Sequence, residues 1–139
     1  MKKFKFNLEN VLQIKKYNEE ECKMALGLAI SVLNEIENKI KENALKQHKA
    51  ESEKLKDPAQ MMTWNNYIVR LENETEMLLE QAAKAEIVVE EKRTLYMEAF
   101  KELRAMEKIR EKREEEYKKE MNEKESAEID ELFAAKKGQ

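Results

Sequence analysis

The amino-acid sequence predicts an all-α fold: a long two-helix antiparallel coiled-coil hairpin in which the C-terminal helix overhangs the N-terminal one. The 139 residues include only two glycines and one proline, and 41% are charged, a composition typical of long helices. Apolar residues recur at alternating steps of three and four, the spacing of a coiled-coil seam. One strong break, at Asp57-Pro58, divides the chain into two arms. We therefore expect residues 1–139 to form a single hairpin domain.

The turn is predicted from the residues around Pro58. Asp57 is a favourable N-cap, Pro58 suits the first helical position, and Gln60 falls at N3 as in a capping box. The first helix is expected at about residues 8–55, with Asn7 as its cap, the turn at about 56–58, and the second helix at about 59–136. Gly27 costs a helix only about 1 kcal/mol relative to alanine and should not end the first helix.

The second arm carries the clearer seam, in which only Thr75 and Lys92 are polar. Its positions are Trp64, Ile68, Leu71, Thr75, Leu78, Ala82, Ala85, Val89, Lys92, Tyr96, Ala99, Leu103 and Met106. An average step of 3.5 residues sustained over this length is typical of a left-handed coiled coil.

The first arm repeats this pattern less cleanly and weakens toward the turn. Its seam positions are Leu8, Leu12, Lys15, Glu19, Cys22, Leu26, Ala29, Leu33, Ile36 and Ile40. If the arms fold back at Asp57-Pro58, facing residues should have numbers that sum to roughly 115, since both helices rise equally per residue. Leu33 would then face Ala82, and Leu8 would reach about as far as Met106.

The second helix is expected to overhang beyond Met106, where the strict seam fails at Arg110 and Arg113. The overhang carries apolar residues for which the sequence offers no intrachain partner: Ile109, Tyr117, Met121, Ile129, Leu132 and Phe133. Binding to a partner protein and fraying of the helix are the two explanations for such exposed residues. Phe4 and Phe6 should lie beside the base of the overhang, so both termini are expected to form one contact surface.

Around the turn, Met61, Met62, Trp64 and Tyr67 lie close together in the sequence. Methionine and aromatic residues are enriched in protein interfaces. Trp64 either contacts a partner or closes the end of the coil. Tyr67 lies off the main seam, which favours a partner contact.

The composition argues against an enzyme and against most ligands. One histidine, one cysteine and no glycine-rich loop leave no basis for a catalytic site, a cofactor site or a small-molecule substrate. His48 lacks neighbours at metal-ligand spacing, and Cys22 on the seam acts as a small apolar residue. The net charge of −3 disfavours nucleic acid. The sequence also shows no signal peptide core and no membrane span, so we expect a cytoplasmic protein.

Three segments together resemble the flagellar type III export protein FliJ family. The first is Phe4-x-Phe6-x-Leu8-Glu9-x-Val11-Leu12, followed by Lys15-Lys16 and Glu19-Glu20, although the family usually has Arg where Lys15 or Lys16 stands. The second is Trp64-Asn65-Asn66-Tyr67-Ile68-x-x-Leu71 after the turn. The third is Glu107-Lys108-Ile109-Arg110-Glu111-Lys112, then Glu125 and Ile129-Asp130-Glu131-Leu132. They cover nearly the whole chain in the right order.

The resemblance implies a stalk whose terminal ends enter the hexameric flagellar export ATPase and whose hairpin meets the membrane protein of the export gate. The implied site at the ATPase end comprises Phe4, Phe6, Leu8, Arg110, Arg113, Tyr117, Ile129, Leu132 and Phe133. The implied site at the gate end comprises Trp64, Tyr67, Leu71, Glu74 and Leu78, with Glu74 standing where the family has an apolar residue. The protein would be peripheral to the flagellar basal body at the cytoplasmic membrane.

Two other functions fit the same sequence. One is an adaptor that carries export chaperones to the export machine. The other is a self-assembling structural coiled coil unrelated to secretion. A stalk or an adaptor needs a free apolar overhang, whereas a homo-oligomer would bury those residues against its own copies.

Overall fold

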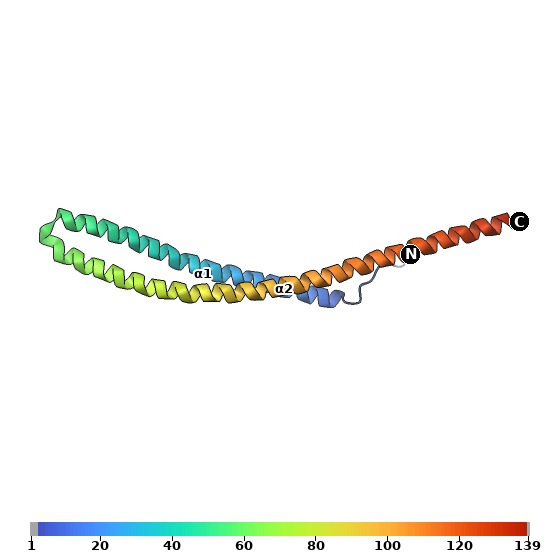
Figure 1. Ribbon diagram of the computed structural model, residues 1–139, viewed down its shortest axis with the longest axis horizontal. Coiled ribbons are helices and arrows are strands. Elements are labelled where there is room, and N and C mark those ends of the chain that lie inside the picture. Colours follow the sequence, from blue (N-terminus) through green and yellow to red (C-terminus); the bar gives the residue numbers. More distant parts are fainter. Residues whose placement is uncertain (1–2, 139) are drawn as a thin grey trace. The chain divides into compact units, whose positions relative to one another are not determined.

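The computed structural model describes residues 3–138 and is an all-helical two-helix hairpin (Figure 1). Helix α1 spans Glu9–Lys56 with 48 residues, and the longer α2 spans Met61–Lys137 with 77. Between them lies the short 3-10 helix η1, Pro58–Gln60. The predicted fold class is confirmed. That the whole chain forms one domain stays a prediction.

The turn forms where the sequence places it, but it takes up more residues than expected. Asp57 leaves the helical region with φ −133°, and its carbonyl oxygen accepts a 3.1 Å hydrogen bond from the Gln60 N–H. The Asp57 side chain makes no capping bond. Because Pro58–Gln60 form a 3-10 turn, α2 begins at Met61 and not near residue 59.

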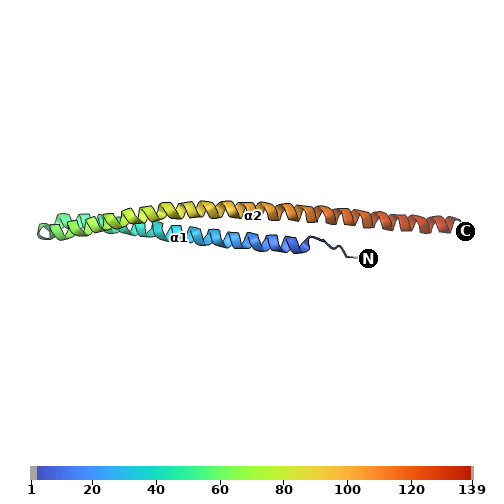
Figure 2. The ribbon, with the colours of Figure 1, turned by 90° about the horizontal axis from the view of Figure 1, so that it is seen from below.

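The contacts divide the hairpin into two compact units, and both helices contribute to each. Residues Glu21–Met97 form the unit that we call the turn unit. The described residues on either side, 3–20 and 98–138, form the terminal unit. In the turn unit α1 and α2 lie side by side, as both views show (Figures 1 and 2). Each unit is described separately below.

The seam is formed by the residues that the periodicity identified. Every predicted position on α2, from Trp64 to Met106, is buried or half-buried, and so is every predicted position on α1 from Leu8 to Ile40. Small buried residues, such as Ala82 and Ala99, let the helix backbones approach closely. Burial of a continuous apolar stripe stabilises helices that would be marginal alone.

Near the turn, the α1 seam continues through polar residues that the hydrophobic pattern missed. Asn43 is buried, Gln47 is half-buried and Ala50 is buried. The Asn43 amide donates a 3.4 Å hydrogen bond from Nδ2 to Glu74 Oε2, and Gln47 Nε2 donates one of 3.4 Å to Glu72 Oε1. The seam therefore does not end before the turn; it continues through two polar residues to Ala50.

These hydrogen bonds correct the expected register. A sum of roughly 115 would place the partners of Asn43 and Gln47 two and four residues earlier than Glu74 and Glu72. The point at which the two helices fold back lies later in the chain than expected, because the 3-10 turn adds residues after Pro58. The numbers of these hydrogen-bonded residues sum to about 118. Whether Leu33 faces Ala82 or Ala85 stays a prediction.

The terminal unit has its own apolar core. Phe6, Leu12 and Leu103 are buried together, and Phe4, Leu8 and Met106 pack against them. Leu8 and Met106 thus reach the same level, as expected. Lys15 Nζ donates a 2.9 Å hydrogen bond to Glu102 Oε2 across the two helices, again two residues beyond the expected register.

Helix α1 begins at Glu9, one residue later than expected with Asn7 as its cap. The first helical hydrogen bond runs from the Leu12 N–H to the Leu8 carbonyl oxygen at 2.9 Å, so Leu8, and not Asn7, occupies the cap position. The Asn7 side chain bonds to α2 instead, since its Oδ1 accepts a 3.0 Å hydrogen bond from Arg113 Nη1. The start of α1 is thus fixed by a tertiary contact.

Candidate partner-binding surfaces

The first candidate surface lies in the terminal unit, where aromatic side chains of the N-terminal segment pack on α2. The Phe4 and Tyr117 rings lie 5.6 Å apart between centroids, tilted by 49°. The Arg110 guanidinium lies 5.9 Å from the Phe4 ring centre, and that of Arg113 lies 5.5 Å from the Phe6 ring centre. Arginine over an aromatic face is attractive at such distances. The structure therefore brings together Phe4, Phe6, Arg110, Arg113 and Tyr117.

Ion pairs reinforce this packing. Arg110 Nε donates a 3.0 Å hydrogen bond to Glu9 Oε2, and its Nη1 lies 3.6 Å from Glu114 Oε2. The hydrogen bond from Arg110, followed by one from Gln13, lowers the pKa of Glu9 below its ordinary value. Carboxylates that accept such bonds stay ionised to lower pH. Glu9 is therefore a charged anchor for Arg110 at neutral pH.

These contacts correct the expected extent of the overhang. Tyr117 has an intrachain partner in Phe4, and half-burial continues along α2 at Arg110, Glu114, Tyr117 and Met121. The seam does not fail after Met106; the N-terminal segment covers α2 beyond the start of α1. The Tyr117 hydroxyl is covered and has no hydrogen-bond partner among the described residues, so the ring and not the hydroxyl stabilises this contact.

The C-terminal members of the same predicted set are not part of this cluster. Ile129, Leu132 and Phe133 are exposed by 52%, 68% and 62%. Every described residue of α2 after Met121 is exposed. The predicted ATPase end therefore consists of two parts, a packed aromatic cluster and an exposed apolar stretch.

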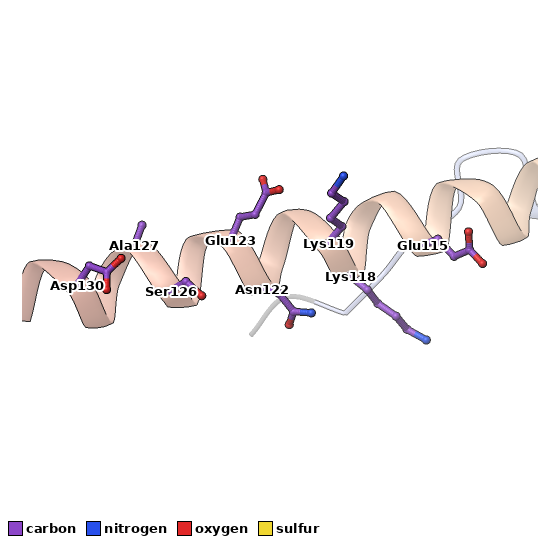
Figure 3. A pocket seen from close by; sticks show the side chains of 8 residues that line it. All are labelled: Glu115, Lys118, Lys119, Asn122, Glu123, Ser126, Ala127 and Asp130. Carbon is purple, nitrogen blue, oxygen red and sulfur yellow. The ribbon is translucent and has the colours of Figure 1, made fainter.

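An acidic bias of this stretch was not recognised in the sequence. Figure 3 shows the surface formed by Glu115, Lys118, Lys119, Asn122, Glu123, Ser126, Ala127 and Asp130. All eight side chains come from α2, which leaves this surface open. Between residues 114 and 131, acidic residues outnumber lysines. A local charge count along the chain would have revealed this bias.

The second candidate surface lies beside the turn. Trp64 and Tyr67 meet edge to face, with ring centroids 6.2 Å apart at 74°, and both are half-buried. Leu78 is half-buried, whereas Glu74 is exposed and accepts the hydrogen bond from Asn43. Leu71 is only 3% exposed, because it packs in the seam. A partner on this surface would contact Trp64 and Tyr67, whereas Leu71 is too deeply buried to offer much surface.

A cleft of about 900 Å³ adjoins this aromatic pair. The cations Lys46, Lys49 and Arg70 line it together with Trp64 and Tyr67, and the buried Ala50 is part of the same lining. The hydrophobic pattern identified the aromatic residues but not the cations. These cations come from both helices, so the sequence does not show that they lie together until the two helices are placed side by side.

The described residues offer little for other chemistry. Within residues 3–138, no group of three or more His, Cys, Asp and Glu side chains is placed to hold a metal ion. The helices in this described part also include no stretch long and apolar enough to span a bilayer.

Comparison with known proteins gives a match to a protein family. The family model described as "Flagellar FliJ protein" matches residues 4–138. Searches of curated proteins and of solved structures find no match. The family match includes both candidate surfaces, the turn and both helices in full. On this evidence the chain belongs to the flagellar FliJ family, whose members are non-enzymatic components of the flagellar export apparatus.

Proposed function

We propose that this protein is a stalk that inserts its terminal ends into the hexameric flagellar export ATPase and couples that ATPase to the membrane protein of the export gate. The stalk promotes export of flagellar proteins. It resides in the cytoplasm, at the periphery of the flagellar basal body.

One observation carries the proposal: α2 continues past the N-terminal segment with Ile129, Leu132 and Phe133 exposed. Exposed apolar residues close together on a soluble surface mark sites of protein contact. Their spacing of three and one places them on one side of a helix. The central opening of a ring-shaped ATPase would shield this stretch from water.

The packed cluster supports the proposal as a fixed base for the inserted stretch. Phe4, Arg110 and Tyr117 hold the N-terminal segment on α2 through ring, cation and ion-pair contacts. Arg110 and Arg113 are engaged within the chain, so they position the end of the stalk rather than offer free charges. The gate end is assigned to Trp64, Tyr67, Glu74 and Leu78 beside the buried Leu71.

The test is truncation after Met121. A deletion that begins at residue 107 would remove Arg110, Arg113 and Tyr117, and so the contacts that hold the N-terminal segment. Among the described residues, truncation after Met121 removes only exposed side chains. We expect the helicity of the remaining chain, measured by circular dichroism, to be retained, while pull-down by the hexameric export ATPase and stimulation of its hydrolysis are lost.

A matched set of substitutions separates the apolar side chains from helix length. Ile129→Gln, Leu132→Gln and Phe133→Gln together should abolish ATPase binding. The control combines Met24→Gln, Leu28→Gln and Leu45→Gln, which are also exposed apolar residues, at 70%, 68% and 72%. Normal binding by both the truncated protein and the triple variant of Ile129, Leu132 and Phe133 would refute insertion of this end.

The adaptor for export chaperones is the second candidate function, favoured by the partly exposed aromatic pair Trp64 and Tyr67 beside the turn. It predicts chaperone capture that survives truncation after Met121. A self-assembling coiled coil predicts instead that light scattering gives a mass well above 16.5 kDa and that truncation reduces it.

A further inference from the structure

The cleft beside the turn is large enough for a peptide. Its volume of about 900 Å³ lies within the range of sites that hold substantial ligands, roughly 300–1,000 Å³. It forms where the seam contains the small residue Ala50, which is 1% exposed, near the bulky Trp64 and Tyr67. A small residue in the seam leaves space beside the two rings, and the 3-10 turn lies next to this space.

One wall of the cleft is aromatic. Trp64 and Tyr67 hold each other edge to face at 6.2 Å between centroids. Both rings line the cleft while half-buried, so each keeps exposed apolar surface. Rigid aromatic walls of this kind bind apolar or aromatic side chains with little loss of conformational entropy.

The cleft lining carries three cations and two carboxylates, Glu53 and Asp57, so the cations are in excess. Lys46 and Lys49 on α1 and Arg70 on α2 line it, and no ion pair joins any of these three to another described residue. Glu53, also in the lining, lies 3.8 Å from Lys56 and is partly neutralised. Three cations around an aromatic wall attract a ligand that combines carboxylates with an apolar group.

We propose that this cleft binds an acidic peptide segment of a partner protein, with an apolar anchor side chain against Trp64 and Tyr67 and carboxylates at Lys46, Lys49 and Arg70. The proposal rests on the proposed function in one respect, since it takes the turn as an end that meets a partner. A nucleotide is the competing occupant, and displacement of the peptide by ATP tests it.

The experiment uses Trp64 as its reporter, because it is the one tryptophan of the chain. The probe is a synthetic peptide with the sequence of residues 125–135, which is acidic, contains Ile129, Leu132 and Phe133, and lacks tryptophan. The comparison peptide replaces each of its acidic residues by lysine. We expect a saturable change in Trp64 fluorescence with the acidic peptide alone, weakened by salt because screening reduces charge contacts.

Charge reversal locates the site. The variant Lys46→Glu, Lys49→Glu and Arg70→Glu should weaken binding at least about tenfold, which corresponds to about 1.4 kcal/mol. A control variant with the same change in net charge, Lys23→Glu, Lys41→Glu and Lys84→Glu, alters exposed residues outside the cleft lining and should bind like the unaltered protein. Equal helicity of the two variants by circular dichroism excludes unfolding as the cause.

Four results would overturn the proposal: no saturable change with the acidic peptide, equal binding of the lysine peptide, equal weakening by both charge reversals, or displacement of the acidic peptide by ATP at a similar concentration. Concentration-dependent self-association of the intact chain that vanishes on truncation after Met121 would instead make a second copy the occupant. The peptide measurement involves neither ATPase nor gate, so its failure is distinct from failure of the stalk.

Discussion

Arg110 Nε lies 3.0 Å from Glu9 Oε2, although 101 positions separate the two residues in the chain. The same guanidinium lies 5.9 Å from the centre of the Phe4 ring. One side chain of α2 thus fastens both the first turn of α1 and the segment before it. Both members of the pair are partly exposed, so the pair defines geometry more than it adds stability.

This pair predicts a pH dependence at the start of α1. The hydrogen bond from Arg110 lowers the pKa of Glu9 from 4.5, so the folded state holds the carboxylate ionised at a pH where the unfolded chain has begun to bind a proton. The contribution of the pair is complete above that ordinary value and is lost as pH falls through the lowered pKa. An NMR titration of the Glu9 carboxyl should show the lowered pKa directly.

Arg110→Gln provides the control for this titration. Removal of the guanidinium should return the pKa of Glu9 toward its ordinary value, since the remaining hydrogen bond from Gln13 is neutral. An unchanged pKa in the variant would show that Arg110 does not hold the carboxylate in solution.

The core of the terminal unit predicts a strong contrast between two leucines of α1. Leu12 is 1% exposed and packs with Phe6 and Leu103, whereas Leu28 is 68% exposed. Leu12→Ala should lower the free energy of unfolding by about 2–4 kcal/mol through lost burial and a cavity. Leu28→Ala should change it by less than about 0.5 kcal/mol. Equal midpoints in urea denaturation would contradict the assignment of the seam.

The register predicts specific cross-links in the turn unit. If the sum of about 118 at Asn43–Glu74 and Gln47–Glu72 extends to Leu33, Leu33→Cys and Ala85→Cys should cross-link under mild oxidation, because level positions come nearest to the Cβ separation of roughly 3.5–4.5 Å that a disulfide requires. Leu33→Cys with Ala82→Cys should cross-link more slowly. Both pairs are placed in a Cys22→Ser background and scored by mobility on a denaturing gel. The reverse order of rates would restore the register that sums to about 115, the value expected from equal rise about Asp57-Pro58.

We predict that Asn43 lowers the stability of the hairpin but favours one register of the two helices. It is a buried polar residue in the seam, 6% exposed, and its amide makes a rather long hydrogen bond of 3.4 Å to Glu74. Asn43→Leu should raise the free energy of unfolding by about 1 kcal/mol, because an apolar side chain avoids the desolvation of the amide. A single buried asparagine also fixes the register of coiled coils.

The companion measurement for Asn43→Leu is the cross-linking assay. In the variant, the Leu33→Cys pairs with Ala82→Cys and Ala85→Cys should become more nearly equal in rate. Greater stability with an unchanged preference would mean that the turn alone fixes the register. Matched substitution of exposed Asn38 by Leu should affect neither stability nor rates.

The sequence was sufficient for the fold because the seam is repetitive. Each step from Ile68 to Leu103 repeats the same spacing, so many positions support one assignment. The register was less accessible, because it depends on how many residues the turn takes up. Asp57-Pro58 locates the turn, but the additional 3-10 residues through Gln60 shift the hydrogen-bonded pairs near the turn.

The candidate sites were harder to predict for a different reason. Arg110 and Tyr117 look like unpaired residues when only the arms are compared, since their partners lie in the short segment before α1. Phe4 and Phe6 show no helical periodicity that would align them with α2. At the turn, Lys46 and Arg70 are ordinary surface cations until the two helices are placed together. These contacts depend on tertiary placement, which local pattern does not specify.

The exposure of the C-terminal end of α2 affects the enthalpy and entropy with which any receptor binds it. From Asn122 to Lys137 no described side chain is buried, so this part of the helix depends on propagation from the packed turns before it. Propagation adds little free energy per residue in water and weakens with warming. A receptor that binds this part must hold all of its turns helical, and the entropy of that ordering opposes association. Binding should show a large favourable enthalpy and a negative heat-capacity change, and substitutions to alanine at exposed polar positions such as Asn122 should tighten it without any new contact.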